Sequence, residues 1–168
     1  MKLNADVEKA LNDQVNLELL SAYTYLGMAA YFENHSYPGF SSWMRLQGGE
    51  ELGHARKFFQ YIFDRGGSLE LKEIPQPAQK FNSPLEVYEA SLAQEQKVSE
   101  AIINIYELAG KHKDYATQSF LKWFLDEQVE EENTVSDFIG QLKVVGNTPV
   151  GLFQMDREAA RRSATSGK

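Results

Sequence analysis

Hydrophobic residues recur every three or four positions along most of this chain, which is the period of an amphipathic α-helix. The pattern is interrupted at Pro38-Gly39, Gly66-Gly67 and Gly146-Asn147, pairs that are typical of helix ends. It therefore predicts four long helices and a shorter fifth one, over about residues 4–32, 40–64, 84–111, 115–145 and 149–162. We expect one all-α domain over residues 1–168, with a bundle core at about 4–145 and a frayed tail at Ser163–Lys168.

The segment from Ser68 to Asn82 contains Pro75 and Pro77 and shows no sustained helical period. A connection of this length inside a compact domain needs a reason. The second helix would be roughly 38 Å long at about 1.5 Å per residue, and about 16 extended residues at ~3.3 Å each cover some 50 Å. We therefore expect the segment to travel the length of the bundle, which makes the second and third helices parallel.

Each long helix carries a polar residue near the middle of its apolar face. In the second helix, Glu51 and His54 lie on the face that also holds Met44 and Phe58. The corresponding positions in the other helices are Glu18, Glu95, and the pair Gln128 and Glu131. Burying an isolated carboxylate costs several kcal/mol even after relaxation, so polar positions that converge at one level of a bundle predict a bound cation. A Glu-x-x-His pair on an inward face is the arrangement of carboxylate-bridged metal sites in four-helix bundles.

An internal repeat relates the two halves of the chain. Glu18 and Glu95 are 77 residues apart, and the same spacing separates Glu51 from Gln128 and His54 from Glu131. The long helices thus form two copies of a helical hairpin, as expected of a pseudo-twofold site for two metal ions. Because the second copy has Gln-x-x-Glu in place of Glu-x-x-His, we expect one half of the site to bind metal more weakly.

The buried polar residues divide into two ligand sets that share Glu51 as a bridge, namely Glu18, Glu51 and His54 for one ion and Glu51, Glu95 and Glu131 for the other. Gln128 would be a hydrogen-bonding or water-holding neighbour. Tyr25 lies about two turns beyond Glu18 on the same face. Its phenol could donate a hydrogen bond to a ligand carboxylate or supply an electron. The alternative is that Tyr25 is an ordinary core tyrosine. Oxygen-rich ligation with one imidazole suits iron(II) or manganese(II), tolerates zinc(II) and disfavours copper(I).

Composition narrows the classes of function. With 42% hydrophobic and 24% charged residues the chain is globular, and no run of about 18 apolar residues predicts a membrane span. The first residues lack the apolar stretch of a secretory signal, so we expect the protein in the cytoplasm. The absence of cysteine excludes disulfides and thiolate-held metal sites. The net charge of −7 argues against a nucleic-acid partner and favours the attraction of cations.

This set of residues resembles the ferroxidase centre of the ferritins, and most closely that of the non-haem bacterial type. The resemblance rests on Glu18, Tyr25, the run from Glu50 to His54, Glu95, Trp123-Phe124 and the run from Glu127 to Glu131. It extends over essentially the whole chain and implies a ferritin-like four-helix bundle with a long crossover between the second and third helices and a short fifth helix. It also implies a hollow homo-oligomeric shell of 24 subunits that oxidises iron(II) with dioxygen or peroxide and stores the ferric mineral inside.

In the bacterial type a third iron site lies beside the pair. By resemblance its ligands would be Glu50, Glu127, Glu130 and the shared Glu131. The alternative is a solvated acidic face, since residues 130–132 form a run of charge. Haem is not expected, because the haem-binding relatives use a methionine at the position of Leu52.

Two other functions fit the same pattern. A rubrerythrin-like di-iron oxidase or peroxidase would use the same bundle without storage, but the chain lacks the cysteines of a rubredoxin-type iron site. A purely structural helical bundle would leave the converging polar positions unexplained. The fifth helix favours the shell, because we expect another subunit to cover its apolar residues Val150, Leu152, Phe153 and Met155.

Overall fold

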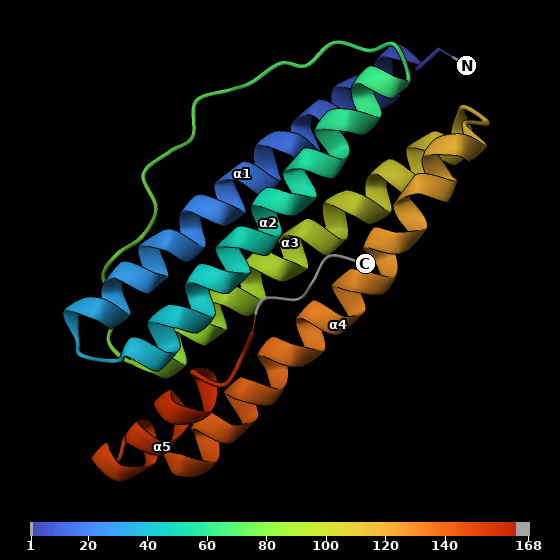
Figure 1. The fold of residues 1–168 in the computed structure, drawn as a ribbon. Helices are drawn as coiled ribbons and strands as arrows, with labels where there is room; N and C mark the ends of the chain where they lie inside the picture. Colours follow the sequence, from blue (N-terminus) through green and yellow to red (C-terminus); the bar gives the residue numbers. More distant parts are fainter. Residues whose placement is uncertain (1, 164–168) are drawn as a thin grey trace.

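The computed structural model describes residues 2–163, which form five α-helices and no strands (Figure 1). The helices are α1 (Ala5–Asn34), α2 (Pro38–Asp64), α3 (Pro84–Lys111), α4 (Tyr115–Val145) and α5 (Pro149–Ala159). Helix α1 packs against α2 and α3, α3 packs against α4, and α5 packs across α2 and α4. The connection between α2 and α3 runs alongside α1 for its full length, so that α2 and α3 are parallel. The predicted all-α bundle with a crossover is therefore confirmed.

Side-chain caps begin four of the five helices. The side chains of Asn4, Ser83, Asp114 and Thr148 accept hydrogen bonds from backbone N–H groups in the first turns of α1, α3, α4 and α5. The predicted start of α2 at Phe40 is wrong by two residues, because Pro38 is the first residue of the helix. The fixed φ angle of proline suits this position, so the Pro-Gly pair opens α2 instead of separating two helices.

The ends of two helices also differ from the prediction. Helix α1 continues to Asn34, past the expected end at Phe32, and α5 ends at Ala159 instead of Arg162. Beyond the end of α5, the side chain of Arg162 contacts Glu50 of α2. The tail that was predicted to be frayed lies outside the described residues, except for Ser163.

Two asparagines on α1 hold the crossover in place. The Asn12 side chain donates to the carbonyl of Ser68 at 2.9 Å and accepts from the amide of Glu70 at 2.6 Å. One turn later, Asn16 donates to the carbonyl of Glu70 and accepts from the amide of Lys72, both at 2.8 Å. The two side chains thus hydrogen-bond the extended backbone of the crossover as a neighbouring strand would. These bonds satisfy N–H and C=O groups that have no partner within the segment itself.

The core consists of two apolar clusters, one toward each end of the bundle. Residues buried in one cluster include Tyr25, Phe32, Phe40, Trp43, Met44, Tyr88 and Val135. Residues buried in the other include Leu11, Val15, Phe58, Ile62, Val98, Leu121 and Phe124. Along every long helix the predicted polar residues fall between its contributions to the two clusters. The polar level is therefore sealed on both sides by packed apolar side chains.

Two neighbouring apolar rows run along α3, and the structure buries one of them more deeply than the other. Leu85, Leu92 and Tyr106 are only half-buried, whereas Val87 and Val98 are fully buried. The helical period fits either row, and packing in the bundle decides which one is buried. Glu95 lies on both rows and is buried.

Helix α5 packs on its own chain, which corrects the expectation that only another subunit would cover it. Leu152 and Met155 are buried against the bundle, while Val150 and Phe153 are 70% and 60% exposed. The Asp156 side chain accepts a hydrogen bond of 2.9 Å from the amide of Phe40 and so caps α2. None of the five helices combines the length and hydropathy needed to cross a bilayer.

Candidate metal centre

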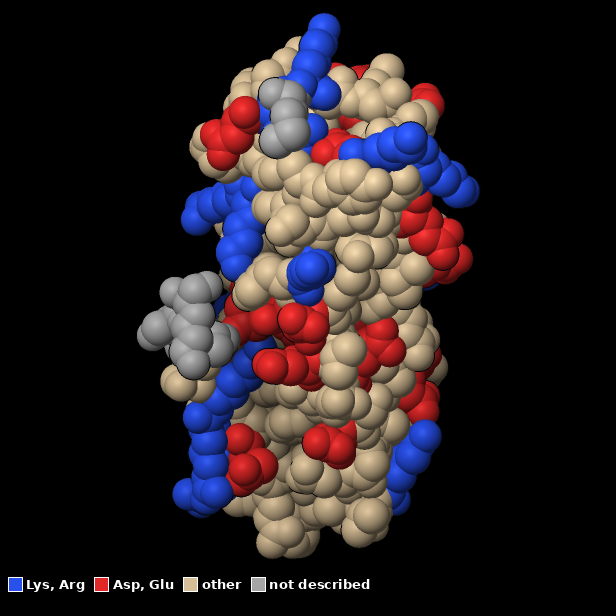
Figure 2. All heavy atoms as spheres, turned by 90° about the vertical axis from the view of Figure 1, so that its right-hand side faces the viewer, with Lys and Arg blue, Asp and Glu red and all other residues tan. Residues whose placement is uncertain are grey.

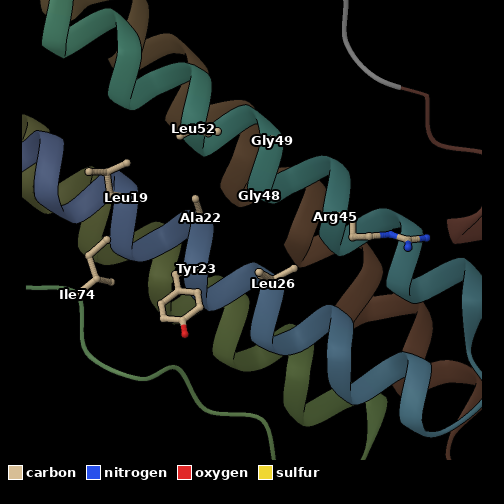
Figure 3. A pocket seen from close by; sticks show the side chains of 9 residues that line it. All are labelled: Leu19, Ala22, Tyr23, Leu26, Arg45, Gly48, Gly49, Leu52 and Ile74. Atoms are coloured by element: carbon tan, nitrogen blue, oxygen red, sulfur yellow. The ribbon is translucent and has the colours of Figure 1, made fainter.

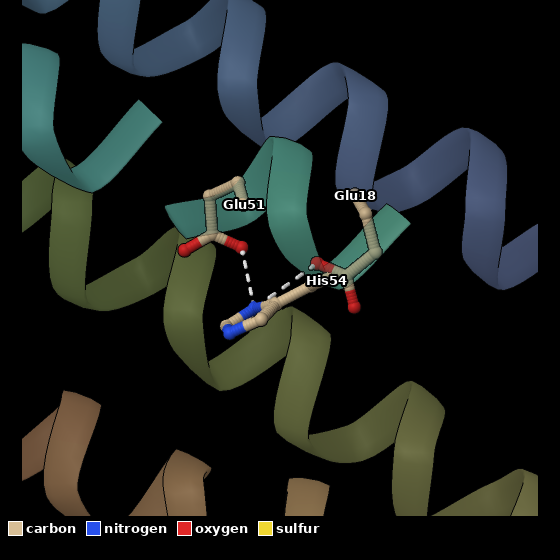
Figure 4. Close-up of side chains that lie close together, drawn as sticks. All are labelled: Glu18, Glu51 and His54. Atoms are coloured by element: carbon tan, nitrogen blue, oxygen red, sulfur yellow. Dashed lines mark ion pairs between the residues drawn. The ribbon is translucent and has the colours of Figure 1, made fainter. Parts of the chain in front are cut away.

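Glu18 of α1 and Glu51 and His54 of α2 point toward one another inside the bundle (Figure 4). The Nδ1 atom of His54 lies 3.3 Å from Oε2 of Glu51 and 4.0 Å from Oε2 of Glu18. Ligand atoms from all three buried side chains lie within 4.8 Å of one another. A divalent ion bound at about 2.0–2.2 Å needs its ligand atoms about 4 Å apart or closer, so only a small contraction would close this set around a metal.

The same three atoms lack other partners. Oε2 of Glu18, Oε2 of Glu51 and Nδ1 of His54 are buried, and none has a hydrogen-bond partner among the described residues. Leaving such a group unsatisfied costs about 1–3 kcal/mol, and more when it is charged. A bound cation would satisfy all three atoms at once, so the residues fit a metal ion.

Two glutamines orient the open carboxylates. Gln14 donates to Oε1 of Glu18 at 2.7 Å, and Gln47 donates to Oε1 of Glu51 at 3.0 Å. Each glutamine precedes its glutamate by one helical turn, so donor and acceptor lie on the same face. Each carboxylate is thus held by one oxygen and presents the other to the centre. Hydrogen bonds of this kind position metal ligands in known sites.

The second predicted ligand set is closed by hydrogen bonds. The Tyr25 hydroxyl donates to Oε1 of Glu95 and shares a 2.8 Å hydrogen bond with Ser91, while Gln128 donates to Oε2 of Glu95 at 3.2 Å. Gln47 also donates to Oε2 of Glu131 at 2.8 Å. A metal ion at this half would compete with these hydrogen bonds, and the weaker binding there stays a prediction.

The buried carboxyl groups raise one another's pKa values. Burial, and then the charge of Glu51, raise the pKa values of Glu18 and Glu95 well above their usual range. The same two causes raise the pKa of Glu131 to about 7. Burial lowers the pKa of His54, but the adjacent Glu51 and the charge of Glu131 more than offset this and leave it raised. The metal-free centre therefore retains protons that a cation would displace.

The acids predicted for a third site lie at different depths. Glu50 contacts Arg162, and its charge acts on Glu131. Glu127 is half-buried, and its charge acts on His54. Glu130 is exposed on α4. The structure thus places Glu50 and Glu127 beside the buried set and leaves Glu130 at the solvent, and the role of all three stays a prediction.

Sequence reasoning missed several residues that support the centre. The glutamines Gln14 and Gln47 carried a readable signal, since each lies four residues before a buried glutamate on the same stripe. Ser91 and Ser99, which contact Tyr25 and Gln128, carried none. Arg162 was assigned to the end of the fifth helix and could not be linked to Glu50 without the tertiary fold.

The fold and this buried group define a class of protein. Residues 8–145 match the family model of the ferritin-like domain. The chain therefore belongs to the ferritin-like family.

Individual relatives narrow the class. A bacterial non-heme ferritin of Staphylococcus haemolyticus is 47% identical over 161 residues, which cover 96% of this chain and 97% of the relative. The bacterial non-heme ferritin of Staphylococcus aureus is 42% identical over the same length. A solved structure described as an open pore ferritin from Archaeoglobus fulgidus has a TM-score of 0.95 and 39% identity, covering 97% of this chain and all of that chain. Within the family, the predicted resemblance to ferritins of the non-haem bacterial type is confirmed.

Replacing Glu51 by Gln tests whether the centre is built for a cation. The metal-free Glu51→Gln protein is expected to melt no lower than the parent at pH 7, because the change removes a charge that raises the pKa values of Glu18 and Glu95. When folding raises the pKa of a carboxyl group, the folded protein loses stability as the pH rises above the pKa that the group has in the unfolded chain. The higher stability of metal-free Glu51→Gln relative to the parent should therefore be present at neutral pH and vanish below about pH 4. Zinc should reverse the order, since the parent binds it more strongly.

Calorimetric melting with and without zinc measures both effects, and Glu107→Gln, at an exposed position on α3, is the matched control. A metal-free Glu51→Gln protein that melts well below the parent while the control does not would mean that Glu51 is first a structural hydrogen-bonding residue.

Proposed function

We propose that this chain is the subunit of an iron-storage shell in the cytoplasm. It oxidises iron(II) with dioxygen or peroxide and deposits the ferric mineral in the hollow of the shell. The three buried ligand atoms without partners, on Glu18, Glu51 and His54, are the observation that carries the proposal. They make a site that costs free energy when it is empty. The similarity to non-heme ferritins supports iron as the ion.

The two halves of the centre would fill in order. The first iron(II) binds Glu18, Glu51 and His54, whose free atoms already face one another. The second binds Glu51, Glu95 and Glu131 and displaces the hydrogen bonds that Glu95 accepts from Tyr25 and Gln128. Two iron(II) ions give up the two electrons that reduce one dioxygen, and two protons complete hydrogen peroxide. In the metal-free centre Tyr25 donates to Glu95, and its role as an electron source stays a prediction.

Surface charge would help to concentrate iron(II). Acidic side chains gather at mid-height of the face that Figure 2 shows, bordered by Lys and Arg side chains. The net charge of −7 per chain makes the average field attractive for cations. In an assembled shell these charges would add.

A hollow between α1 and α2 supports assembly. It has a volume of about 550 Å³ and is lined by mostly apolar side chains, including those of Leu19, Tyr23, Leu26, Leu52 and Ile74 (Figure 3). Tyr23, Leu26 and Leu52 are 42%, 55% and 38% exposed. Contiguous apolar surface of this kind marks interaction sites. The occupant that we propose is a second copy of the chain, because a shell of one kind of subunit must join copies to copies.

Removal of the imidazole should slow iron oxidation. In His54→Ala the initial rate of iron(II) oxidation by dioxygen is expected to fall at least about tenfold, since even the loss of an outer-shell partner costs a metal site about 10–100-fold. Stopped-flow absorbance of ferric iron measures the rate. His112→Ala is the matched control, because His112 lies at the end of α3 and contacts Asp6 of α1. An equal loss in both variants, or no loss in His54→Ala, would rule out His54 as a ligand of the substrate iron.

A charge in the hollow should block assembly. We expect Leu52→Glu to sediment as small species at neutral pH and moderate salt, whereas the parent sediments as a large shell. The matched control is Ile103→Glu on α3, which places the same charge at an apolar residue that is 47% exposed outside the hollow. A parent protein that sediments as a monomer would contradict the shell. Normal assembly of Leu52→Glu would show that the hollow is not where copies meet.

A further inference from the structure

Arg162 is held against α2 by two contacts. Its Nη2 atom lies 2.5 Å from Oε2 of Glu50, and its guanidinium carbon lies 4.4 Å from the ring centroid of Trp43. The side chains of Arg162 and Glu50 are 18% and 19% exposed. A guanidinium that is this well covered and stacked on an indole has a defined position, unlike most surface arginines.

The charge of Arg162 acts on the metal centre as well as on Glu50. It opposes the rise in the pKa of Glu131 that burial, Glu51 and Glu50 cause. Its Nη1 atom is buried without a hydrogen-bond partner among the described residues. Arg162 therefore lies where the outer acid Glu50 and the buried acid Glu131 both feel its positive charge.

Helix α5 determines where Arg162 can reach. The helix is fixed to the start of α2 by the hydrogen bond from the Phe40 amide to Asp156. The backbone of α5 approaches α2 so closely at Gly39 that a Cβ atom there would lie 1.7 Å from the carbonyl oxygen of Asp156. Arg162 follows three residues after the end of this docked helix. Its guanidinium is thus tethered close to Glu50 even when the contact is broken.

We propose that the guanidinium of Arg162 is a tethered counter-cation that pairs with Glu50 at the outer acidic set until a metal ion displaces it. A metal ion that binds Oε2 of Glu50 competes with Arg162 for that oxygen, and the two cations repel each other at this distance. Arg162 thereby weakens the outer site and lets the buried pair fill first. The inference rests on the proposed function, since it assumes that this face of the centre receives metal.

Zinc titration of the assembled, metal-free protein tests the inference without any oxidation step. Arg162→Gln removes the charge, and we expect it to raise the affinity of the weakest class of zinc sites by about tenfold or more, while the tight site of Glu18, Glu51 and His54 changes less than about twofold. The matched control is Arg161→Gln, which makes the same change of charge at a side chain that is 78% exposed and paired with Glu158. Its zinc isotherm should match that of the parent. Isothermal titration calorimetry resolves the two classes of site.

Three results would overturn the role of Arg162: a change of less than about twofold in the weak class, a loss of affinity, or an equal rise in Arg161→Gln. If Arg162→Gln does not assemble, Arg162→Lys keeps the charge without the planar fork. We expect Arg162→Lys to bind zinc at the weak class of sites more tightly than an Arg161→Lys control does. Equal binding by the two variants would contradict the proposal. Absence of tight zinc sites from the parent and from every variant would instead overturn the proposed metal centre itself.

Discussion

The burial of several carboxyl groups at one level of the bundle is the constraint on which the rest of this structure depends. Burial alone raises the pKa values of Glu18, Glu95 and Glu131, and each negative charge raises those of its neighbours. The protein offsets the cost of burial for some of these carboxyl groups and not for others. It supplies hydrogen bonds to Glu95 and Glu131 but leaves one oxygen of Glu18 and of Glu51 without a partner. A core that only needed to fold would have no reason for this difference, whereas a core that receives a cation needs open ligand atoms.

The topology follows from the need to bring four helices to that level. The crossover makes α2 and α3 parallel, so that each helical hairpin contributes one half of the centre. Helices α2 and α4 face each other across large side chains, with the rings of Phe58 and Phe124 4.2 Å apart and those of His54 and Trp123 5.5 Å apart. The rings of Phe58, Phe124 and Trp123 pack beside the centre, and the low dielectric that they create strengthens any ion–ligand interaction.

The periodicity of the sequence was enough to predict the helices and the polar residues on their inward faces, and the length of the aperiodic segment at residues 68–82 predicted the crossover. A buried face shows in the chain as a run of apolar residues with a 3.6-residue period, and a carboxylate inside that run stands out. The period could not choose between two adjacent rows on α3, because Leu92 lies on one row and Val98 on the other, and only packing decides which row is buried. Contacts between distant segments left no periodic signal, so the bonds of Asn12 to the crossover and of Arg162 to Glu50 emerged only from the structure.

A crystal grown without metal and soaked in zinc(II) tests the central claim most directly. The anomalous difference map should show an ion bound by Oε2 of Glu18, Oε2 of Glu51 and Nδ1 of His54 at about 2.0–2.2 Å. Gln14 and Gln47 should keep their hydrogen bonds to the other carboxylate oxygens. Zinc found only on the exposed acids of α4, with these three atoms bonded to protein groups instead, would show that the buried set is a structural network and would contradict the account.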